Sequence, residues 1–503
     1  MEAEKLTIII VICAYFALLI GIGWWHSRKI KNASDYILAG RGLSFWAFVL
    51  LLTGSAASGM TILGTSGLGY FAGWPSFWEQ FCVPLSCSFC MIFFGVKLSR
   101  LAEKRQYLTI EDYLCERYYS QRTMRLLSSV VVLLVSAIYL VGQFLAVGLI
   151  LSWMLDIRFS YALVLGAVIT MCYVLLGGLR AIASIASMQV IIMIAGVLVL
   201  CPMIISQAPD FSSVLAGIDE NMTKVVYPQA DPPYAKYAFF TPLYALSFVM
   251  FLTCGLASAP HIVSNVLAVS KKSYFKWAPL VIFGVYFTMM AVIKMSGFAA
   301  RAMAERGLIA VKQPDESFIK AVEYILADYK IFAALAGTVV LAAVMTTTDR
   351  LMLTIGNCVS WDIYKKYVHK TASDRLVNII NRVTVAVTTL VAMFAALQEF
   401  KLLAFLIWAA IGVMFSSFTV PLLGGLYWRR ATKAGAIASM GIGFVSAVVF
   451  AYIGKYVKPL PVHFSLFSFC LALISFVGVS LLTRKPDESL LDLTETGAYI
   501  QAK

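Results

Sequence analysis

Long apolar runs recur along this chain of 503 residues, and they restrict what it can fold into. Most runs reach about 20 residues, the length that a helix needs to cross the hydrocarbon core of a bilayer. The composition agrees, because 61% of the residues are hydrophobic and 13% are charged. We therefore predict an all-α membrane protein with about 13 transmembrane helices, at residues 6–25, 45–71, 78–99, 125–154, 160–178, 183–205, 240–267, 278–300, 331–359, 377–397, 402–427, 434–454 and 462–482.

The formal net charge of +14 indicates membrane orientation rather than binding to nucleic acid. With the N-terminus outside, the inner segments hold 24 Lys and Arg residues if Arg125, at the first position of its span, is counted with them. The outer segments hold 12, and four lie within spans: Lys97, Lys294, Arg350 and Arg382. An excess of basic residues inside is the usual pattern of membrane proteins. The first run is too long for a cleaved signal peptide, and its positive charges follow it. The sequence predicts a multi-pass cell-membrane protein with a cytoplasmic C-terminus.

Enzyme machinery is absent from the sequence. There is no P-loop, HExxH or GxSxG motif, and only two of the four histidines, His261 and His463, lie within predicted spans. Nine of the ten cysteines lie in spans, where they act as small hydrophobic residues rather than as a disulfide framework. We predict neither an enzyme nor an ATP-driven pump. A transport-like membrane sensor is disfavoured, because the tail after the last span is short.

One predicted span carries an unusual polar cluster. Residues 341–353 read LAAVMTTTDRLML, so three threonines lead directly into Asp349 and Arg350. Ionisable residues at membrane depth usually face a bundle interior or a wet cavity. Neutral hydroxyl and carbonyl oxygens are suitable ligands for a hard cation such as Na⁺. For any single threonine, a hydrogen bond to the carbonyl four residues earlier is an equal alternative.

Two other spans contain residues that interrupt helices. Residues 53–69 read TGSAASGMTILGTSGLG, and residues 252–265 read LTCGLASAPHIVSN, with a proline inside the apolar run. Small residues can serve helix packing in membranes. Their density favours discontinuous helices, whose unwound carbonyls line a site near the midplane. Two such spans, five apart in order, are typical of an inverted repeat.

Several motifs, in this order and spacing, resemble the sodium/solute symporter family, which includes proline, pantothenate, monocarboxylate and sodium/glucose porters. The similarity extends from residue 35 to residue 443. It includes DYILAGR (35–41), TIEDYLCERY (109–118), YVLLGGLRAI (173–182), APHIVSN (259–265), AAVMTTTD (342–349), WDIY (361–364) and GGLYWRRATKAGA (424–436).

The resemblance implies a LeuT-type core of two inverted five-helix repeats in a single transporter domain. Residues 45–205 and 240–427 would form the repeats, 1–30 and 434–482 peripheral helices, and 485–503 a cytoplasmic tail. The family's Na⁺ ligands correspond here to the carbonyl oxygens of Gly54, Ala57 and Ala343 and the hydroxyls of Thr346 and Thr347.

The chain departs from the family pattern at three positions. Proline porters carry an acid where this chain has Ala56, and many members carry Asp where it has Ala186. Both changes remove a carboxylate that helps to tune cation binding. Many relatives also carry Arg at the position of Asn265. The coupling ion is therefore expected to be Na⁺, with H⁺ as the alternative.

By family geometry the solute would lie beside the broken helices, and the candidate substrate-binding residues are Ser58, Thr61, Gln80, Gln143, Ser258 and Trp408. Gln143 has an equal alternative as an interhelical hydrogen-bonding residue. We expect Glu79 to belong to an interfacial belt with neighbouring tryptophans rather than to a ligand site. Lys294 is expected to extend its ammonium group toward water.

These observations predict a secondary active transporter in the lipid bilayer. It would import a small polar organic solute with Na⁺ by alternating access, the solute being a monocarboxylate, an amino acid or a pantothenate-like acid. Nucleic acid is not an expected partner, and the sequence leaves the oligomeric state open. A proton-coupled symporter of the same fold is the alternative function.

Overall fold

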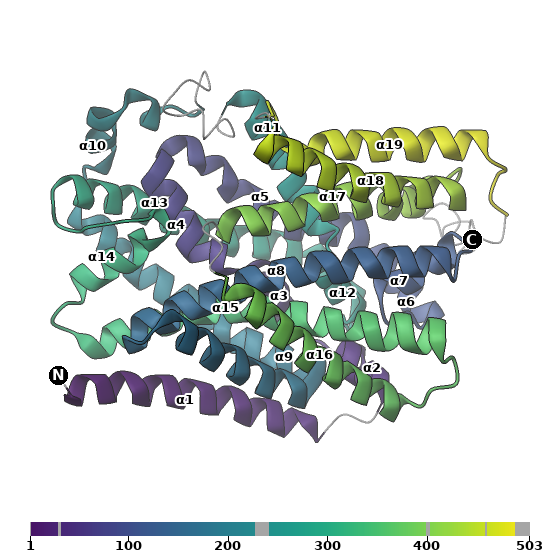
Figure 1. Cartoon of the computed structure of the whole chain (residues 1–503), viewed down its shortest axis with the longest axis horizontal. Helices are drawn as coiled ribbons and strands as arrows, with labels where there is room; N and C mark the ends of the chain where they lie inside the picture. Colours follow the sequence, from purple (N-terminus) through teal and green to yellow (C-terminus); the bar gives the residue numbers. More distant parts are fainter. Residues whose placement is uncertain (1, 29–31, 227–240, 399–402, 458–459, 488–503) are drawn as a thin grey trace.

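The computed structural model describes residues 2–28, 32–226, 241–398, 403–457 and 460–487 (Figure 1). Its first half contains helices α1 (Glu2–Ser27), α2 (Ala33–Leu38), α3 (Phe45–Ala56), α4 (Thr65–Ala72), α5 (Glu79–Phe89), α6 (Val96–Arg105), α7 (Ile110–Arg117), α8 (Thr123–Leu155), α9 (Phe159–Gln207) and α10 (Phe211–Ile218). The second half contains α11 (Pro242–Met250), α12 (Pro260–Leu267), α13 (Ala278–Glu305), α14 (Ser317–Ile325), α15 (Lys330–Asn357), α16 (Asp374–Ala396), α17 (Leu403–Tyr427), α18 (Lys433–Tyr456) and α19 (Phe464–Leu482). Within the described ranges, strand pairing is confined to an isolated bridge between Leu43 and Val269.

The predicted number of spans agrees with these helices. In the described part of the chain, 10 helices are long and apolar enough to cross a membrane, or up to 12 if two bent pairs each count as one span. Helix α9 has 49 residues, and a straight helix of that length would measure about 74 Å, more than twice the thickness of a hydrocarbon core. Its backbone leaves the helical region at Gly178, where φ is 56° and ψ is −160°. Counting α9 as two spans brings the total of 12 to 13.

Gly178 is required at this turn of α9 for two reasons. Its positive φ is a conformation that residues with a Cβ atom rarely adopt. A Cβ atom would also lie 2.8 Å from the carbonyl oxygen of Tyr36 in α2. The glycine thus allows two spans to follow one another with almost no connecting loop, while α2 packs against the turn.

Both predicted interruptions are present. The pair Phe45–Ala56 and Thr61–Ala72 is bent by 66°, and the pair Pro242–Gly255 and Pro260–Leu267 by 42°. A π-helical segment adjoins each break, at Met60–Gly64 and Phe251–Gly255. Helix α17 packs against both π-helical segments. The two breaks are therefore neighbours of the same helix, although they are far apart in the sequence.

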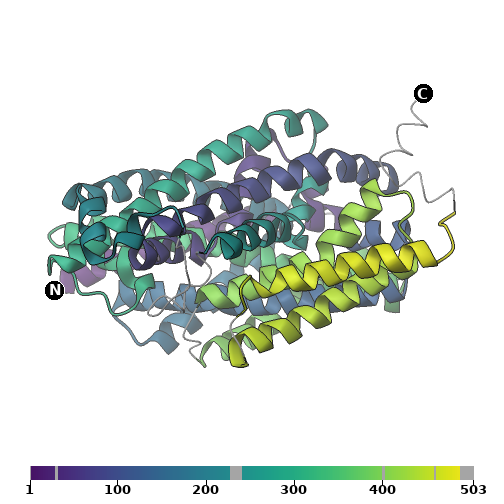
Figure 2. The ribbon, with the colours of Figure 1, turned by 90° about the horizontal axis from the view of Figure 1, so that it is seen from above.

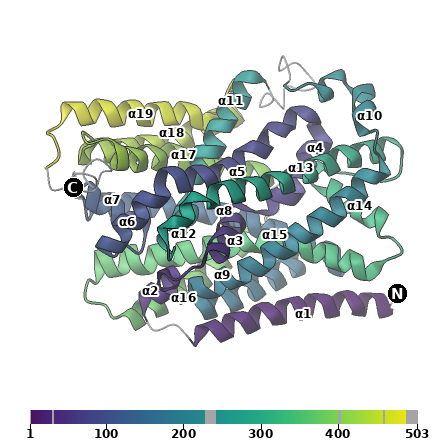
Figure 3. The same ribbon diagram turned by 180° about the vertical axis from the view of Figure 1, so that it is seen from behind.

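The long helices lie side by side along the long axis of the molecule (Figures 1 and 2). Helices α18 and α19 pack against each other at one side, and α1 packs along α9 at the opposite side. The short helices between spans gather at the two ends, with α10 and α14 at one end and α2, α6 and α7 at the other (Figures 1 and 3). The segments predicted to lie outside and those predicted to lie inside are thus at opposite ends of the molecule.

Candidate cation and solute site

The break after α3 leaves backbone carbonyl groups without their helical partners. Ala57 is extended, with φ −72° and ψ 130°. The next two amide groups are used elsewhere, because Ser58 N donates to Thr61 Oγ1 at 2.9 Å and Gly59 N donates to Gln143 Oε1 at 3.2 Å. The carbonyls of the last turn of α3 are consequently available to a partner outside the helix.

Two threonine hydroxyls of α15 meet these carbonyls. Thr347 Oγ1 lies 3.2 Å from the carbonyl oxygen of Gly54 and contacts that of Ala57. Thr346 Oγ1 lies 3.4 Å from the carbonyl oxygen of Ala57 and 2.9 Å from that of Ala343. All five predicted ligand oxygens therefore gather at one place, where Thr346 and Thr347 are fully buried.

This close approach of α3 and α15 depends on a small residue. A Cβ atom at Gly54 would lie 3.2 Å from Thr346 Cβ and 3.0 Å from Val190 Cγ2 of α9. One neighbouring oxygen was not predicted from the sequence: the carbonyl of Ser55 lies 3.2 Å from Thr347 Oγ1. The arrangement offers neutral oxygens alone, which suits a monovalent hard cation. Within the described residues, no three His, Cys, Asp or Glu side chains form a metal-binding group.

Three of the predicted solute residues gather at the break of the second span. Thr61 Oγ1 lies 3.2 Å from the hydroxyl of Tyr286 in α13, a contact that sequence analysis missed. Gln143 of α8 is bonded to the break itself through Gly59, and its Nε2 atom has no hydrogen-bond partner in the described structure. Ser58, one residue before Gly59, is also buried. Some polar atoms of this group already form hydrogen bonds, whereas Gln143 Nε2 could still donate to a solute.

Two further candidates lie near the break of the seventh span. Ser258 Oγ is 2.6 Å from Thr419 Oγ1 of α17 and 2.7 Å from the carbonyl oxygen of Cys254. Trp408, also of α17, packs edge to face on Phe248 with ring centroids 5.0 Å apart. The structure therefore places these residues on the α11–α17 side, apart from the contacts around Thr61.

Lys294 and Glu79 require a correction. The Lys294 side chain does not extend to water; it is fully buried, and its Nζ lies 3.1 Å from Glu79 Oε2. Glu79 is likewise buried rather than part of an interfacial belt, because pairing with a buried cation removes it from the surface. Gln80, in the amide orientation that satisfies its neighbours, accepts from Lys294 Nζ at 3.3 Å and donates to the Met290 carbonyl at 3.0 Å. Gln80 thus belongs to a network between α5 and α13.

The two charged residues after the threonines face different helices. Asp349 accepts a hydrogen bond from the hydroxyl of Tyr173 in α9 through Oδ1, while its Oδ2 has no partner in the described part of the chain. Arg350 faces α12, where Nη2 donates to Ser264 Oγ at 2.6 Å and to the His261 carbonyl at 3.2 Å. Although adjacent in sequence, the two charges do not pair with each other.

A second charged cluster lies at the end of the molecule that carries α7. Arg125 donates to Asp362 Oδ1 at 2.6 Å and to Asp112 Oδ1 at 3.1 Å. Thr109 Oγ1 also donates to Asp362 Oδ1, at 2.8 Å. Burial raises the pKa of the neighbouring Glu111 to about 7. The cluster fixes α7 to the start of α8 and to the π-helical segment Cys358–Val368 that follows α15, away from the candidate cation oxygens.

Known proteins resemble this chain over most of its length. The model of the sodium:solute symporter family matches residues 36–443. A sodium/proline symporter of Haemophilus influenzae is 27% identical, with 97% of this chain and 96% of that protein covered. An osmoregulated proline transporter of Bacillus subtilis is 24% identical, with 96% of each chain covered. A sodium/proline symporter of Escherichia coli is 26% identical, with 96% and 94% covered.

Solved structures show the same architecture. A Na⁺-coupled sialic acid symporter in a substrate-bound outward-open state superimposes with a TM-score of 0.78 at 16% identity, covering 96% of this chain and 99% of that one. A transporter of the nucleobase-cation-symport-1 family gives a TM-score of 0.53 at 13% identity, covering 92% and 97%. At these identities the likeness shows the fold, which is the LeuT-type fold.

Proposed function

The chain belongs to the sodium:solute symporter family, and we propose that the Na⁺ it couples to binds where α15 meets the break after α3. It is a secondary active transporter that imports a small organic solute with Na⁺ by alternating access. The supporting observation is the convergence of Thr346 and Thr347 with the carbonyls of Gly54, Ala57 and Ala343. These groups belong to helices that would lie in opposite repeats, so a bound ion would join the repeats to each other.

These observations define the chemical class of the solute less narrowly than they define the ion. Proline transporters are among the relatives at 24–27% identity over nearly the whole chain, so a proline-like amino acid is the first candidate. Monocarboxylates and pantothenate-like acids are the others. The polar groups around Thr61 and Gln143, together with Ser258 and Trp408, supply hydrogen bonds and an aromatic surface suited to a solute of this size.

A proton-coupled symporter is the second candidate, and one observation favours it. Asp349 is fully buried, and its Oδ2 atom lacks a partner in the described structure. A carboxyl group in such a place could carry a proton across the membrane. The neutral oxygens around Thr347 favour Na⁺, since they offer no group that changes its protonation near neutral pH.

The proposed orientation has the N-terminus outside and the C-terminus in the cytoplasm. It is supported by the distribution of Lys and Arg and by the grouping of α10 and α14 at one end of the molecule (Figure 3). The proposed repeats are residues 45–205 and 240–427, each containing one broken span. Helices α1, α18 and α19 would be peripheral, consistent with their positions at the sides of the bundle (Figure 1).

Uptake into proteoliposomes tests this function. Purified protein would be assayed with labelled L-proline, pyruvate and pantothenate under an inward Na⁺ gradient, an inward K⁺ gradient, or an inward proton gradient without Na⁺. We expect one solute to accumulate above its external concentration only with the Na⁺ gradient. Accumulation with the proton gradient, unaffected by Na⁺, would instead identify a proton symporter.

A further inference from the structure

Arg350 is a buried guanidinium without a neutralising partner. Its side chain is 2% exposed, and no carboxylate in the described part of the structure pairs with it. Both hydrogen bonds of the Arg350 side chain are made by Nη2, and Nε has no acceptor among the described residues. An unpaired charge taken out of water costs several kcal/mol. An ionisable residue at this depth is therefore expected to have a function that compensates for the cost.

The other polar groups beside Arg350 are also unsatisfied. Neither ring nitrogen of His261 has a hydrogen-bond partner in the described residues, and Oδ1 of Asn265 has none. Both side chains are fully buried on α12. The Nδ2 atom of Asn265 donates to the same His261 carbonyl that Arg350 contacts, at 3.1 Å. Polar atoms without hydrogen-bond partners in the described structure thus lie on α12, the helix that Arg350 contacts.

Helix α12 holds no acidic residue that could pair with the guanidinium. It begins at Pro260, directly after the break in the seventh span, and the N–H groups of Ile262 and Val263 in its first turn already donate to the carbonyl oxygen of Ala259. The nearest carboxylate in sequence, Asp349, is bonded to Tyr173 of α9 instead. A role limited to clamping α12 to α15 would need only the two bonds made by Nη2, and an uncharged side chain could make them.

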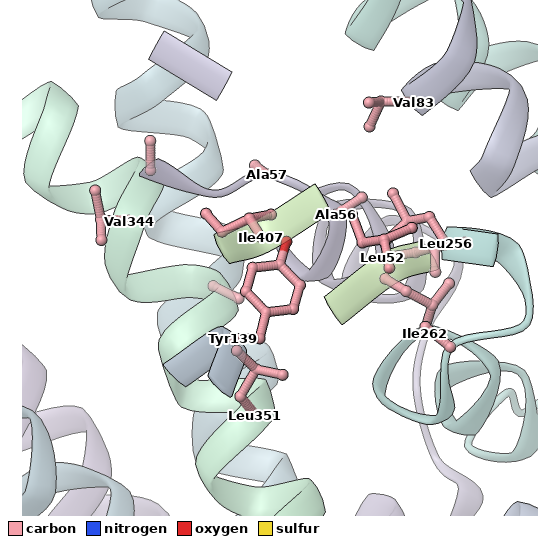
Figure 4. Packing of buried hydrophobic residues seen from close by; sticks show 14 of the residues in the cluster. Leu52, Ala56, Ala57, Val83, Tyr139, Leu256, Ile262, Val344, Leu351 and Ile407 are labelled. Carbon is pink, nitrogen blue, oxygen red and sulfur yellow. The ribbon is translucent and has the colours of Figure 1, made fainter. Parts of the chain in front are cut away.

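The site adjoins the solute region. His261 meets the ring of Tyr139 in α8 edge to face, with centroids 5.7 Å apart. Figure 4 shows the Tyr139 hydroxyl pointing toward the segment that carries Ala56 and Ala57, with Leu351 beside its ring. Thr346 and Thr347 precede Arg350 by four and three residues, which is about one helical turn. Along α15, Arg350 is therefore about one turn from the threonines of the candidate cation site.

We propose that Arg350 binds an anionic group of the transported solute, and that the solute is a carboxylate. This inference rests on the proposed function and narrows it. The three solute classes named above all carry a carboxylate, whereas sugars and other uncharged solutes are excluded. A carboxylate here would also supply the negative charge that the neutral Na⁺ ligands lack.

Four variants distinguish the charge of Arg350 from its hydrogen bonds to α12. Arg350→Gln removes the charge, and Arg350→Lys keeps it without the planar fork. Ser264→Ala removes one bond of the clamp and keeps the charge. Ser264→Asp places an internal carboxylate beside the guanidinium. This last variant should fold at least as well as the wild type, because it pairs a buried charge, and it should compete with the solute.

The measurement is thermal stabilisation of the purified protein in Na⁺ by L-proline, pyruvate and pantothenate, each compared with its amide, which lacks the carboxylate. In the wild type we expect at least one acid to stabilise and its amide to have little effect. Arg350→Gln should weaken binding of that acid by roughly 10- to 100-fold, as for the loss of a hydrogen bond to a charged group. Ser264→Asp should do the same, Arg350→Lys should lose less, and Ser264→Ala should stay within about threefold of the wild type.

Stabilisation by Na⁺ alone should be retained in all four variants, which separates this inference from the proposed function. Equal binding of acid and amide by the wild type would overturn it, as would an Arg350→Gln variant that binds the acid normally. Failure of all three acids to stabilise the wild type would also overturn it. Na⁺-driven uptake of an uncharged solute would show that the solute is not a carboxylate, whereas the proposed Na⁺ symport would still hold.

Discussion

Lys294 of α13 and Glu79 of α5 form an ion pair whose Nζ and Oε2 atoms are 3.1 Å apart, with both side chains almost completely buried. Removing one partner leaves a buried charge unpaired, which costs about 3–5 kcal/mol. We expect Lys294→Met and Glu79→Gln each to lower the melting temperature strongly. The double variant should recover much of the loss, because no unpaired charge remains. Purely additive losses in the double variant would show that the pair does not act as a unit.

Glu111 in α7 predicts a pH dependence of stability. Burial, with a smaller contribution from the charge of Asp112, raises its pKa from the ordinary 4.5 to about 7. At pH values between 4.5 and 7, the Glu111 carboxyl group holds its proton in the folded protein but loses it in the unfolded chain. The free energy of unfolding therefore falls as the pH rises toward 7. The melting temperature of Glu111→Gln relative to wild type should therefore be higher at pH 8 than at pH 5. An unchanged difference between the two pH values would contradict this assignment.

The orientation can be tested with single cysteines and an impermeant thiol reagent in a cysteine-depleted background. Cysteines placed in the 206–239 and 301–330 segments should react from outside. Cysteines in the 100–124 and 360–376 segments should react only after the membrane is permeabilised, so that the reagent reaches the cytoplasmic side. Reaction of the 206–239 segment from the cytoplasm alone would reverse the topology.

The absence of an acid at Ala186 predicts weak Na⁺ affinity. Ala186 is fully buried in α9, four residues before Val190, whose methyl group faces Gly54. At an effective dielectric constant near 20, a carboxylate about 6 Å from the ion contributes roughly 3 kcal/mol before its own desolvation. Ala186→Asp should lower the half-saturating Na⁺ concentration several-fold in uptake assays.

Asp349 is the alternative source of negative charge near the ion. If Asp349 supplies it, Asp349→Asn should raise the half-saturating Na⁺ concentration several-fold. The electrostatic account fails if Asp349→Asn leaves the Na⁺ dependence unchanged and Ala186→Asp does not lower it.

The sequence predicts the spans and their interruptions because these depend on local composition. Apolar length identifies the helices, and the glycines of 53–69 and Pro260 mark the breaks. The meeting of Thr347 with Gly54 could be predicted only through the family resemblance, since 293 residues separate them. No local pattern indicated that Lys294 would pair with Glu79, 215 residues away. Pairings of this kind arise from helix packing and are not visible in hydropathy.

The Na⁺ dependence of uptake tests the proposed ion site most directly, in Thr346→Ala, Thr347→Ala and their serine counterparts. Thr348→Ala is the matched control, because Thr348 Oγ1 bonds the Val344 carbonyl of its own helix at 2.9 Å. Loss of one ligand oxygen should raise the half-saturating Na⁺ concentration roughly 5- to 10-fold. Serine at either position, and alanine at 348, should stay close to the wild type. Wild-type Na⁺ dependence in both Thr346→Ala and Thr347→Ala would contradict the account.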